Sequence, residues 1–90
     1  MNYVICYDLN SPGRNYQPLI DAIRENFPDY FHCLDSRWIV RTGMSAIQIA
    51  NLLYPFMDGN DELLVSQLGR DVAWWGFKGN CEKWLNNNSW

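Results

Sequence analysis

The order in which strand-like and helix-like hydrophobic patterns follow one another limits the possible folds of this chain most. Residues 2–8 are β-branched and aromatic, a composition typical of a strand that is covered on at least one face. Residues 16–27 carry apolar side chains at steps of three and four, which predicts an amphipathic helix. Two polar residues separate the apolar runs 30–34 and 37–42, and this spacing predicts an antiparallel hairpin.

A second helix and two further extended segments complete the order. Ser45 and Gln48 have the spacing of a capping box, which predicts that a helix begins just after Ser45. A strand is expected over 62–68 and a fifth short strand over 72–77, followed by a half-turn of helix and a frayed tail. The order β-α-β-β-α-β predicts an α/β (α+β) ferredoxin-like sandwich, in which both helices lie on one face of an antiparallel sheet.

Length and charge exclude several classes of protein. The chain has 90 residues, so we expect one domain over 1–90, with 72–90 as a C-terminal extension. Its net charge of −3 argues against a non-specific nucleic-acid coat, although it leaves room for a local basic groove. No run approaches membrane-spanning length and no signal segment is seen, so we expect a cytoplasmic protein without a membrane partner.

The three cysteines are odd in number and widely spaced. There is no Cys-x-x-Cys pair and His32 is the only histidine, so the sequence gives little support for a zinc site. Cys6 and Cys33 fall within apolar runs, where we expect free, buried thiols. For His32 a packed or surface position is favoured over an acid–base role, because no orienting carboxylate is evident.

Asp8 stands where the first strand ends, just before a break at Asn10-Ser11-Pro12-Gly13. An unpaired charge at such a position is costly to bury, so it is expected at a rim. Two interpretations remain open for it. Asp8 is either one of a symmetry-related pair that binds Mg²⁺ or Mn²⁺, or the residue that caps an Asx-type turn.

Two sets of polar residues are candidate ligand contacts. Asn10, Ser11 and Arg14 lie in a loop that leads into a helix N-terminus, which suits a phosphate, although an ordinary turn also explains them. Arg37 and Arg41 fall on one face of the same predicted strand. They are either placed for phosphates beside a ligand groove or are solvated edge charges.

Three short runs resemble a known family of small dimeric proteins. Tyr7-Asp8-Leu9-Asn10, Leu34-Asp35-Ser36-Arg37-Trp38 and Asn60-Asp61-Glu62-Leu63-Leu64-Val65 look like members of the family that contains the smaller CRISPR spacer-integration protein and the virulence-associated protein D toxins. The resemblance covers nearly the whole chain and implies a homodimer whose sheets pack face to face. It also implies metal-dependent nuclease chemistry, in which Asp8 from both subunits holds a divalent ion.

In that family the last strand often crosses to the partner, a role that falls here to 72–77. Trp74 and Trp75 are adjacent and point to opposite faces of a strand, so one of them needs a partner to shelter it. We therefore expect Trp74, Trp75 and Phe77 at the dimer interface.

Three functions follow from these patterns. The first is a metal-dependent endonuclease, or a degenerate form of one, that acts at the dimer cleft through paired Asp8. The degenerate form is included because the segment 31–37 departs from the usual nuclease pattern. The second is a non-catalytic dimer that binds a small nucleotide or phosphate ligand. The third is an adaptor that uses its aromatic C-terminal segment to bind a larger protein.

Overall fold

A computed structural model describes all of residues 1–90 as an α+β fold with one antiparallel sheet of four strands. The elements, in chain order, are β1 (Asn2–Asp8), α1 (Gln17–Asn26), β2 (Tyr30–Leu34), β3 (Arg37–Arg41), α2 (Ala46–Leu53), the 3₁₀ turn η1 (Tyr54–Phe56), β4 (Glu62–Leu68) and α3 (Gly79–Asn87).

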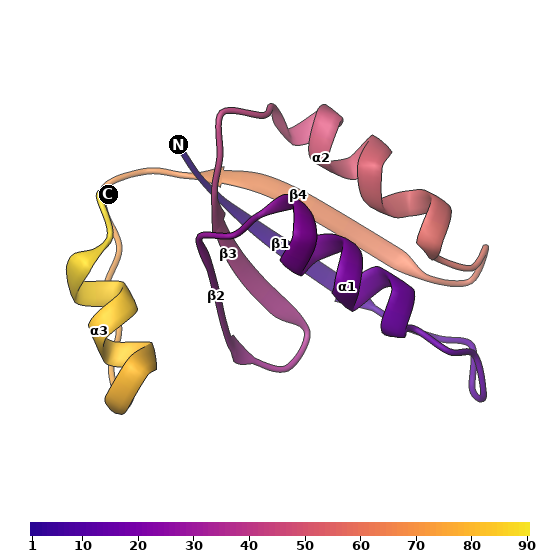
Figure 1. Cartoon of the computed structure of the whole chain (residues 1–90), viewed down its shortest axis with the longest axis horizontal. Helices are drawn as coiled ribbons and strands as arrows, with labels where there is room; N and C mark the ends of the chain where they lie inside the picture. Colours follow the sequence, from indigo (N-terminus) through magenta and orange to yellow (C-terminus); the bar gives the residue numbers. More distant parts are fainter.

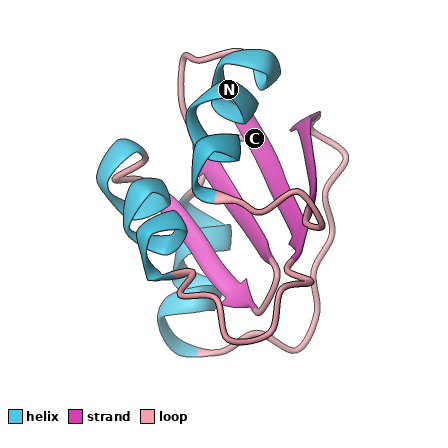
Figure 2. Cartoon of the chain, turned by 90° about the vertical axis from the view of Figure 1, so that its right-hand side faces the viewer, coloured by secondary structure: helices cyan, strands magenta, loops and turns pink.

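The four strands lie in the order β2-β3-β1-β4, so β1 is central and pairs antiparallel with both β3 and β4. The predicted hairpin is confirmed, since Leu34 pairs with Arg37 and two residues form the turn between them. Helices α1 and α2 lie together on one face of the sheet (Figure 2). The opposite face is not covered by either of these helices.

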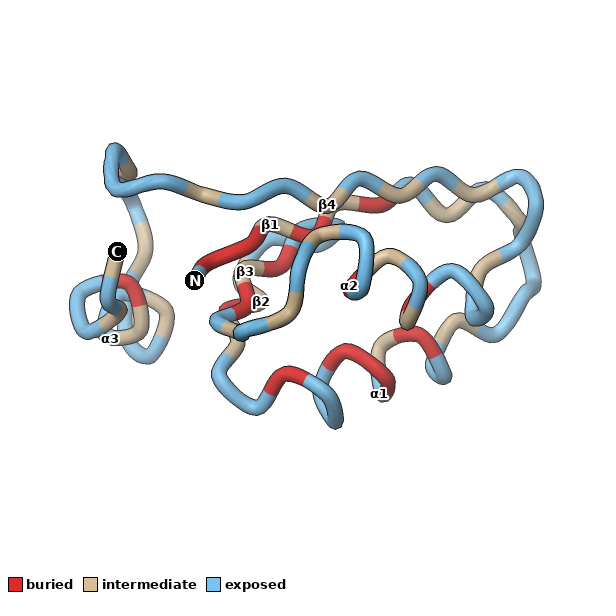
Figure 3. Tube along the Cα trace, turned by 90° about the horizontal axis from the view of Figure 1, so that it is seen from above, coloured by how far each residue is buried: buried red, intermediate tan, exposed pale blue.

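The core lies between that sheet and the two helices, as the alternation of side chains along the strands predicts. Tyr3, Ile5 and Tyr7 of β1 point into it, together with Trp38 and Val40 of β3. Figure 3 shows the buried residues concentrated in the sheet and in α1 and α2. The remaining buried members of this core cluster come from the helices and the segment after α1: Leu19, Ala22, Ile23, Phe27, Ile49 and Leu53.

The start of α2 confirms the predicted capping box. The backbone N–H of Gln48 donates to the Ser45 hydroxyl at 3.3 Å, and the Ser45 N–H donates to the Gln48 side chain at 2.8 Å. These bonds satisfy two backbone donors at the helix start, and they position α2 over the sheet beside β4.

Residues 69–90 form a C-terminal arm, which leaves the end of β4 and carries α3 to one side of the sheet (Figure 1). The fifth strand expected over 72–77 is not confirmed, because these residues pair with no strand of this chain. The expected half-turn is instead a helix of 9 residues, and it contacts β2. No helix of the chain is both long enough and apolar enough to cross a membrane.

The arm is tied to the sheet by a disulfide between Cys33 of β2 and Cys81 of α3. The expectation of a free thiol at Cys33 was therefore wrong, and only Cys6 remains free. Sequence spacing could not reveal this bond, because its two ends are 48 residues apart and meet only when α3 folds back. Disulfides persist mainly in oxidising compartments, so this bond does not favour the predicted cytoplasmic location.

The end of the arm is ordered as well, which corrects the expectation of a frayed tail. The Asn2 side-chain amide donates to the Ser89 carbonyl at 2.8 Å, and the Asn88 amide donates to the Asn2 oxygen at 2.9 Å. The Trp90 indole N–H donates to the Leu85 carbonyl at 3.0 Å. The two chain termini therefore lie close together (Figure 1).

Candidate functional site

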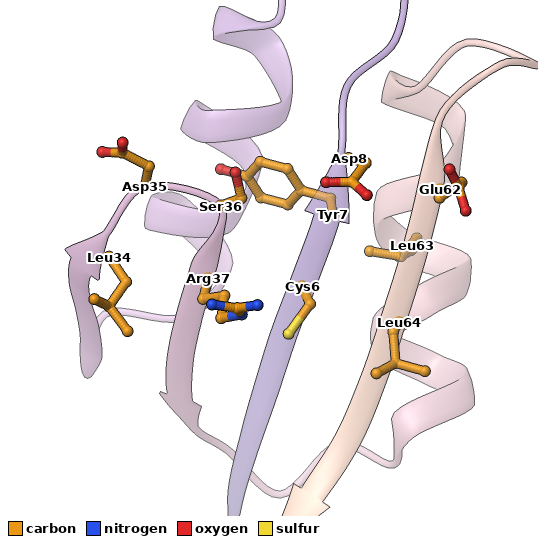
Figure 4. A pocket seen from close by; sticks show the side chains of 10 residues that line it. All are labelled: Cys6, Tyr7, Asp8, Leu34, Asp35, Ser36, Arg37, Glu62, Leu63 and Leu64. Atoms are coloured by element: carbon orange, nitrogen blue, oxygen red, sulfur yellow. The ribbon is translucent and has the colours of Figure 1, made fainter. Parts of the chain in front are cut away.

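The sheet face opposite α1 and α2 is divided by the arm into a covered half and an open half. The covered half includes Phe31, which is buried against Phe77 and Trp84 of the arm, with ring centroids 5.3 and 5.6 Å away. The open half forms a hollow of about 610 Å³ near the turn between β2 and β3 (Figure 4). The residues that line this open hollow are Cys6, Tyr7, Asp8, Leu34, Asp35, Ser36, Arg37, Glu62, Leu63 and Leu64.

Asp8 lies at the rim of the open hollow, as the sequence predicted, and a second carboxylate lies beside it. Asp8 and Glu62 are directly opposite partners in the β1–β4 register. Side chains at such positions share one face of the sheet, with Cβ atoms about 5 Å apart. Figure 4 shows the two residues at neighbouring strand ends. Sequence reasoning missed Glu62 because it lies 54 positions along the chain, and only the register brings it to Asp8.

A two-carboxylate pair is a chemically suitable but incomplete set of metal ligands. Mg²⁺ and Mn²⁺ favour carboxylate oxygens and retain several waters, so the donor type fits these ions. No group of three or more His, Cys, Asp or Glu side chains in the chain could hold a metal. His32 does not contribute, because its ring is stacked on Trp38 with centroids 3.6 Å apart.

Arg37 adds a positive charge to the same hollow. It pairs across the sheet with Cys6 of β1. Cys6 precedes Asp8 by two residues, so the Arg37–Cys6 pair and the Asp8–Glu62 pair are neighbours on the same face of the sheet. No carboxylate oxygen lies within 4.0 Å of its guanidinium. The only ion pair of the chain joins Arg14 to Asp58. Arg37 is therefore free to hold a phosphate beside the carboxylate pair.

Arg41 lies away from this hollow, at the other end of β3, and lines a second one together with residues of the arm. In one of the two interpretations of the sequence, both arginines flank a single ligand groove. They do share a strand, but arm residues line only the hollow of Arg41, so each arginine has different neighbours.

The exposed loop that contains Asn10, Ser11 and Arg14 is bonded to an acidic loop. The Asn10 N–H donates to Asp61 and the Ser11 hydroxyl donates to Asp58, each at 2.7 Å. Arg14 lies 4.0 Å from the Asp58 carboxylate. Because these donors already have carboxylate partners, the geometry favours the turn interpretation over phosphate binding at this loop.

These bonds change the acidity of the groups involved. Hydrogen bonds from Ser11 and from the Gly59 N–H lower the pKa of Asp58, and the nearby Arg14 adds to the effect. Partial burial opposes ionisation of Asp61, but bonds from Asn10, Asp58 and Tyr16 outweigh it and lower its pKa. Burial and the bond to Asp61 raise the pKa of Tyr16. The two loops are therefore held together by charge-assisted hydrogen bonds.

A specific acid sensitivity follows from the lowered pKa values of Asp58 and Asp61. Their contribution to stability is fully present above the unfolded carboxyl pKa of about 4, and it is lost as the pH falls through the lower folded pKa values. We expect the double variant Asp58→Asn, Asp61→Asn to lose less stability below pH 4 than the wild-type chain. Urea unfolding at several pH values measures this. Asp71→Asn, at an exposed position with no side-chain bond, is the control and should leave the pH profile unchanged.

The three residues expected at a dimer interface have different environments. Phe77 packs on Phe31 within the chain, and Trp74 lies 6.0 Å from Trp90 between ring centroids. Trp75 is 94% exposed. Of the three side chains, Phe77 therefore attaches the arm to the sheet, Trp74 packs within the arm, and Trp75 is presented to solvent.

No family model, curated protein or solved structure matches this chain. The resemblance in the three short runs therefore stays a prediction. The functional assignment depends on the geometry of the open hollow alone.

Proposed function

We propose that the chain forms a homodimer that processes nucleic acid with a divalent ion, Mg²⁺ or Mn²⁺, held by Asp8 and Glu62 of both copies. The observation that carries this proposal is the direct cross-strand pairing of Asp8 with Glu62 on the open half of the sheet. As part of it we assign the fold to the ferredoxin-like class. The strand order β2-β3-β1-β4 and the placement of α1 and α2 on one face support that assignment.

A second copy would complete the set of protein ligands for the ion. Like charges directly opposite one another on a sheet are destabilising, so two adjacent carboxylates without a cation are an unfavourable arrangement. One chain supplies only these two ligands, whereas two open halves packed face to face supply four. Apolar side chains on the open half support such packing, since Leu64 is 62% exposed and Leu34 is 44% exposed.

The remaining residues of the open hollow have roles in substrate binding under this proposal. A bound divalent ion polarises a phosphodiester and lowers the pKa of an attacking water. Arg37 provides a guanidinium that forks onto a non-bridging phosphate oxygen. Asp8 and Glu62 keep a local negative charge that the ion neutralises, so the substrate and the ion are expected to bind together.

A protein-binding adaptor is the second candidate, and one observation favours it. Trp75 is 94% exposed on an arm whose other aromatic residues are packed within the chain. An exposed tryptophan is a frequent anchor in protein interfaces. Under this candidate the open hollow needs no metal, so metal binding separates the two functions.

Native mass spectrometry with added Mn²⁺ tests the metal-dependent function. We expect a dimer that gains metal, and we expect Asp8→Asn and Glu62→Gln each to weaken this binding by more than about 10-fold. Each substitution removes a like-charge repulsion, so stability should be unchanged or slightly higher in the absence of metal. Glu25→Gln, at an exposed position of α1, is the matched control and should bind metal normally.

Cleavage assays complete the test with labelled single- and double-stranded DNA and RNA. Metal-dependent cleavage that Asp8→Asn abolishes supports the nuclease. A monomer that binds no Mn²⁺, or a dimer whose metal binding survives both substitutions, contradicts it.

A further inference from the structure

A second hollow, of about 270 Å³, lies between the arm and the sheet, and we refer to it as the arm hollow. One wall is formed by Asp29 and Arg41, at the start of β2 and the end of β3. The other wall is one face of α3, where Asn80, Lys83 and Asn87 recur at the spacing of a single helical stripe. Trp84 contributes the only apolar ring.

Four exposed polar side chains of the arm hollow, those of Arg41, Asn80, Lys83 and Asn87, make no bond within the chain, unlike the side chains of the loop network. Neither Arg41 nor Lys83 has a carboxylate within 4.0 Å. The single ion pair of the chain joins Arg14 to Asp58. The side chains of Asn80 and Asn87 make no hydrogen bond either. A chain with only seven Lys and Arg residues thus has two of them converging on one small hollow without a counterion.

Asp29 indicates that a ligand in this hollow would also carry hydrogen-bond donors. One of its carboxylate oxygens accepts the Trp84 indole N–H at 2.9 Å. Its other oxygen has no partner and accepts hydroxyl donors, and the free amides of Asn80 and Asn87 both donate and accept. A bare anion would be repelled by Asp29, whereas a molecule that carries both an anionic group and hydroxyls would satisfy both sets of groups.

We propose that the arm hollow binds a small anionic sugar, such as a sugar phosphate or a sugar acid. Its anionic group lies between Arg41 and Lys83, and its hydroxyls bond to Asp29 and to the amides of α3. A volume of about 270 Å³ is slightly below the usual range for ligand pockets, which begins at about 300 Å³, so the ligand should be no larger than a single sugar ring. This site is separate from the open hollow and does not depend on the proposed metal chemistry.

The site is also expected to depend on the Cys33–Cys81 disulfide. Cys81 lies between Asn80 and Lys83 on α3, so the bond fixes the wall of the hollow that carries both residues. Reduction would let this wall move away from Arg41 and separate the two positive charges. Binding should therefore be tighter in the oxidised protein.

Titrations with glucose 6-phosphate, glucuronate and glucose, followed by calorimetry and by amide chemical shifts, test the proposal. We expect one or both anionic sugars to bind, at least 10-fold more tightly than glucose, and the tighter of the two identifies the anionic group. Arg41→Gln and Lys83→Gln should each weaken binding by about 10-fold. Arg37→Gln, in the open hollow, and Lys78→Gln, on the arm outside the arm hollow, are the matched controls.

Shift changes should be confined to α3 and to residues near Asp29 and Arg41. Asp8→Asn should bind normally, which separates this site from the proposed metal centre. No binding of either anionic sugar, equal binding of glucose, or equal loss in the Arg37→Gln and Lys78→Gln controls would overturn the proposal.

Discussion

Replacing Cys33 and Cys81 with serine is expected to lower the free energy of unfolding by about 4 kcal/mol. The bond closes a loop with a sequence separation of 48 residues, and a cross-link of that length removes about this much entropy from the unfolded chain at 25 °C. For a domain of this size such a loss lowers the midpoint of thermal unfolding by about 15 °C or more. Thermal and urea unfolding followed by circular dichroism measure the effect.

Cys6→Ser is the matched control for this prediction. Cys6 is a free, half-buried thiol on the open face, so its substitution changes a cysteine without cutting a cross-link. It is expected to cost less than about 1 kcal/mol. Equal stability of the Cys33→Ser, Cys81→Ser double variant and the wild-type chain under oxidising conditions would show that the arm is held by its aromatic contacts alone.

Trp38→Ala is expected to destabilise the chain by about 3–5 kcal/mol, because the indole is fully buried in the centre of the core. The substitution leaves a cavity beneath α1 and α2 and removes the stacking partner of His32. It also removes the indole N–H that donates to the Tyr7 hydroxyl at 3.0 Å. Because a domain of this kind is stable by roughly 5–15 kcal/mol, the substitution should remove a large fraction of the total stability.

Two further variants separate the parts of this effect. Trp38→Phe keeps most of the ring volume but removes the donor to Tyr7, so its cost isolates the buried hydrogen bond and should be about 1–3 kcal/mol. Trp75→Ala removes the same type of side chain at a position that is 94% exposed, and it should change stability by less than about 0.5 kcal/mol. A similar loss in the Trp38→Ala and Trp75→Ala variants would contradict the assignment of Trp38 to the core.

Three groups of polar residues in this chain differ in how far they are satisfied internally. The loop network around Asp58 and Asp61 is bonded throughout, so it is structural. In the open hollow, Asp8, Glu62 and Arg37 share a sheet face without forming an ion pair. The arm hollow has two cations without counterions. The two binding functions that we propose use the two groups whose charges have no partner within the chain.

Local sequence patterns determined most of the secondary structure of this chain. The alternation in 2–8, the two-residue spacing before Arg37 and the capping box at Ser45 each depend on residues within one or two turns of one another. Each of these patterns can be recognised from residues that are close together in the sequence. The four paired strands, both main helices and the hairpin could therefore be predicted. The same reasoning placed Asp8 at a strand end.

The features that matter most for function were decided only by the tertiary structure. Glu62 reaches Asp8 through the β1–β4 register, Cys81 reaches Cys33 because α3 folds back, and Arg41 meets residues of the arm in a second hollow. Each depends on contacts between residues far apart in the chain, for which neighbouring residues carry no signal. The segment 72–77 has a strand-like composition, yet it pairs with no strand, and two of its three aromatic rings pack instead on Phe31 and on the end of the arm. In that segment tertiary packing overrides the intrinsic preference of its residues.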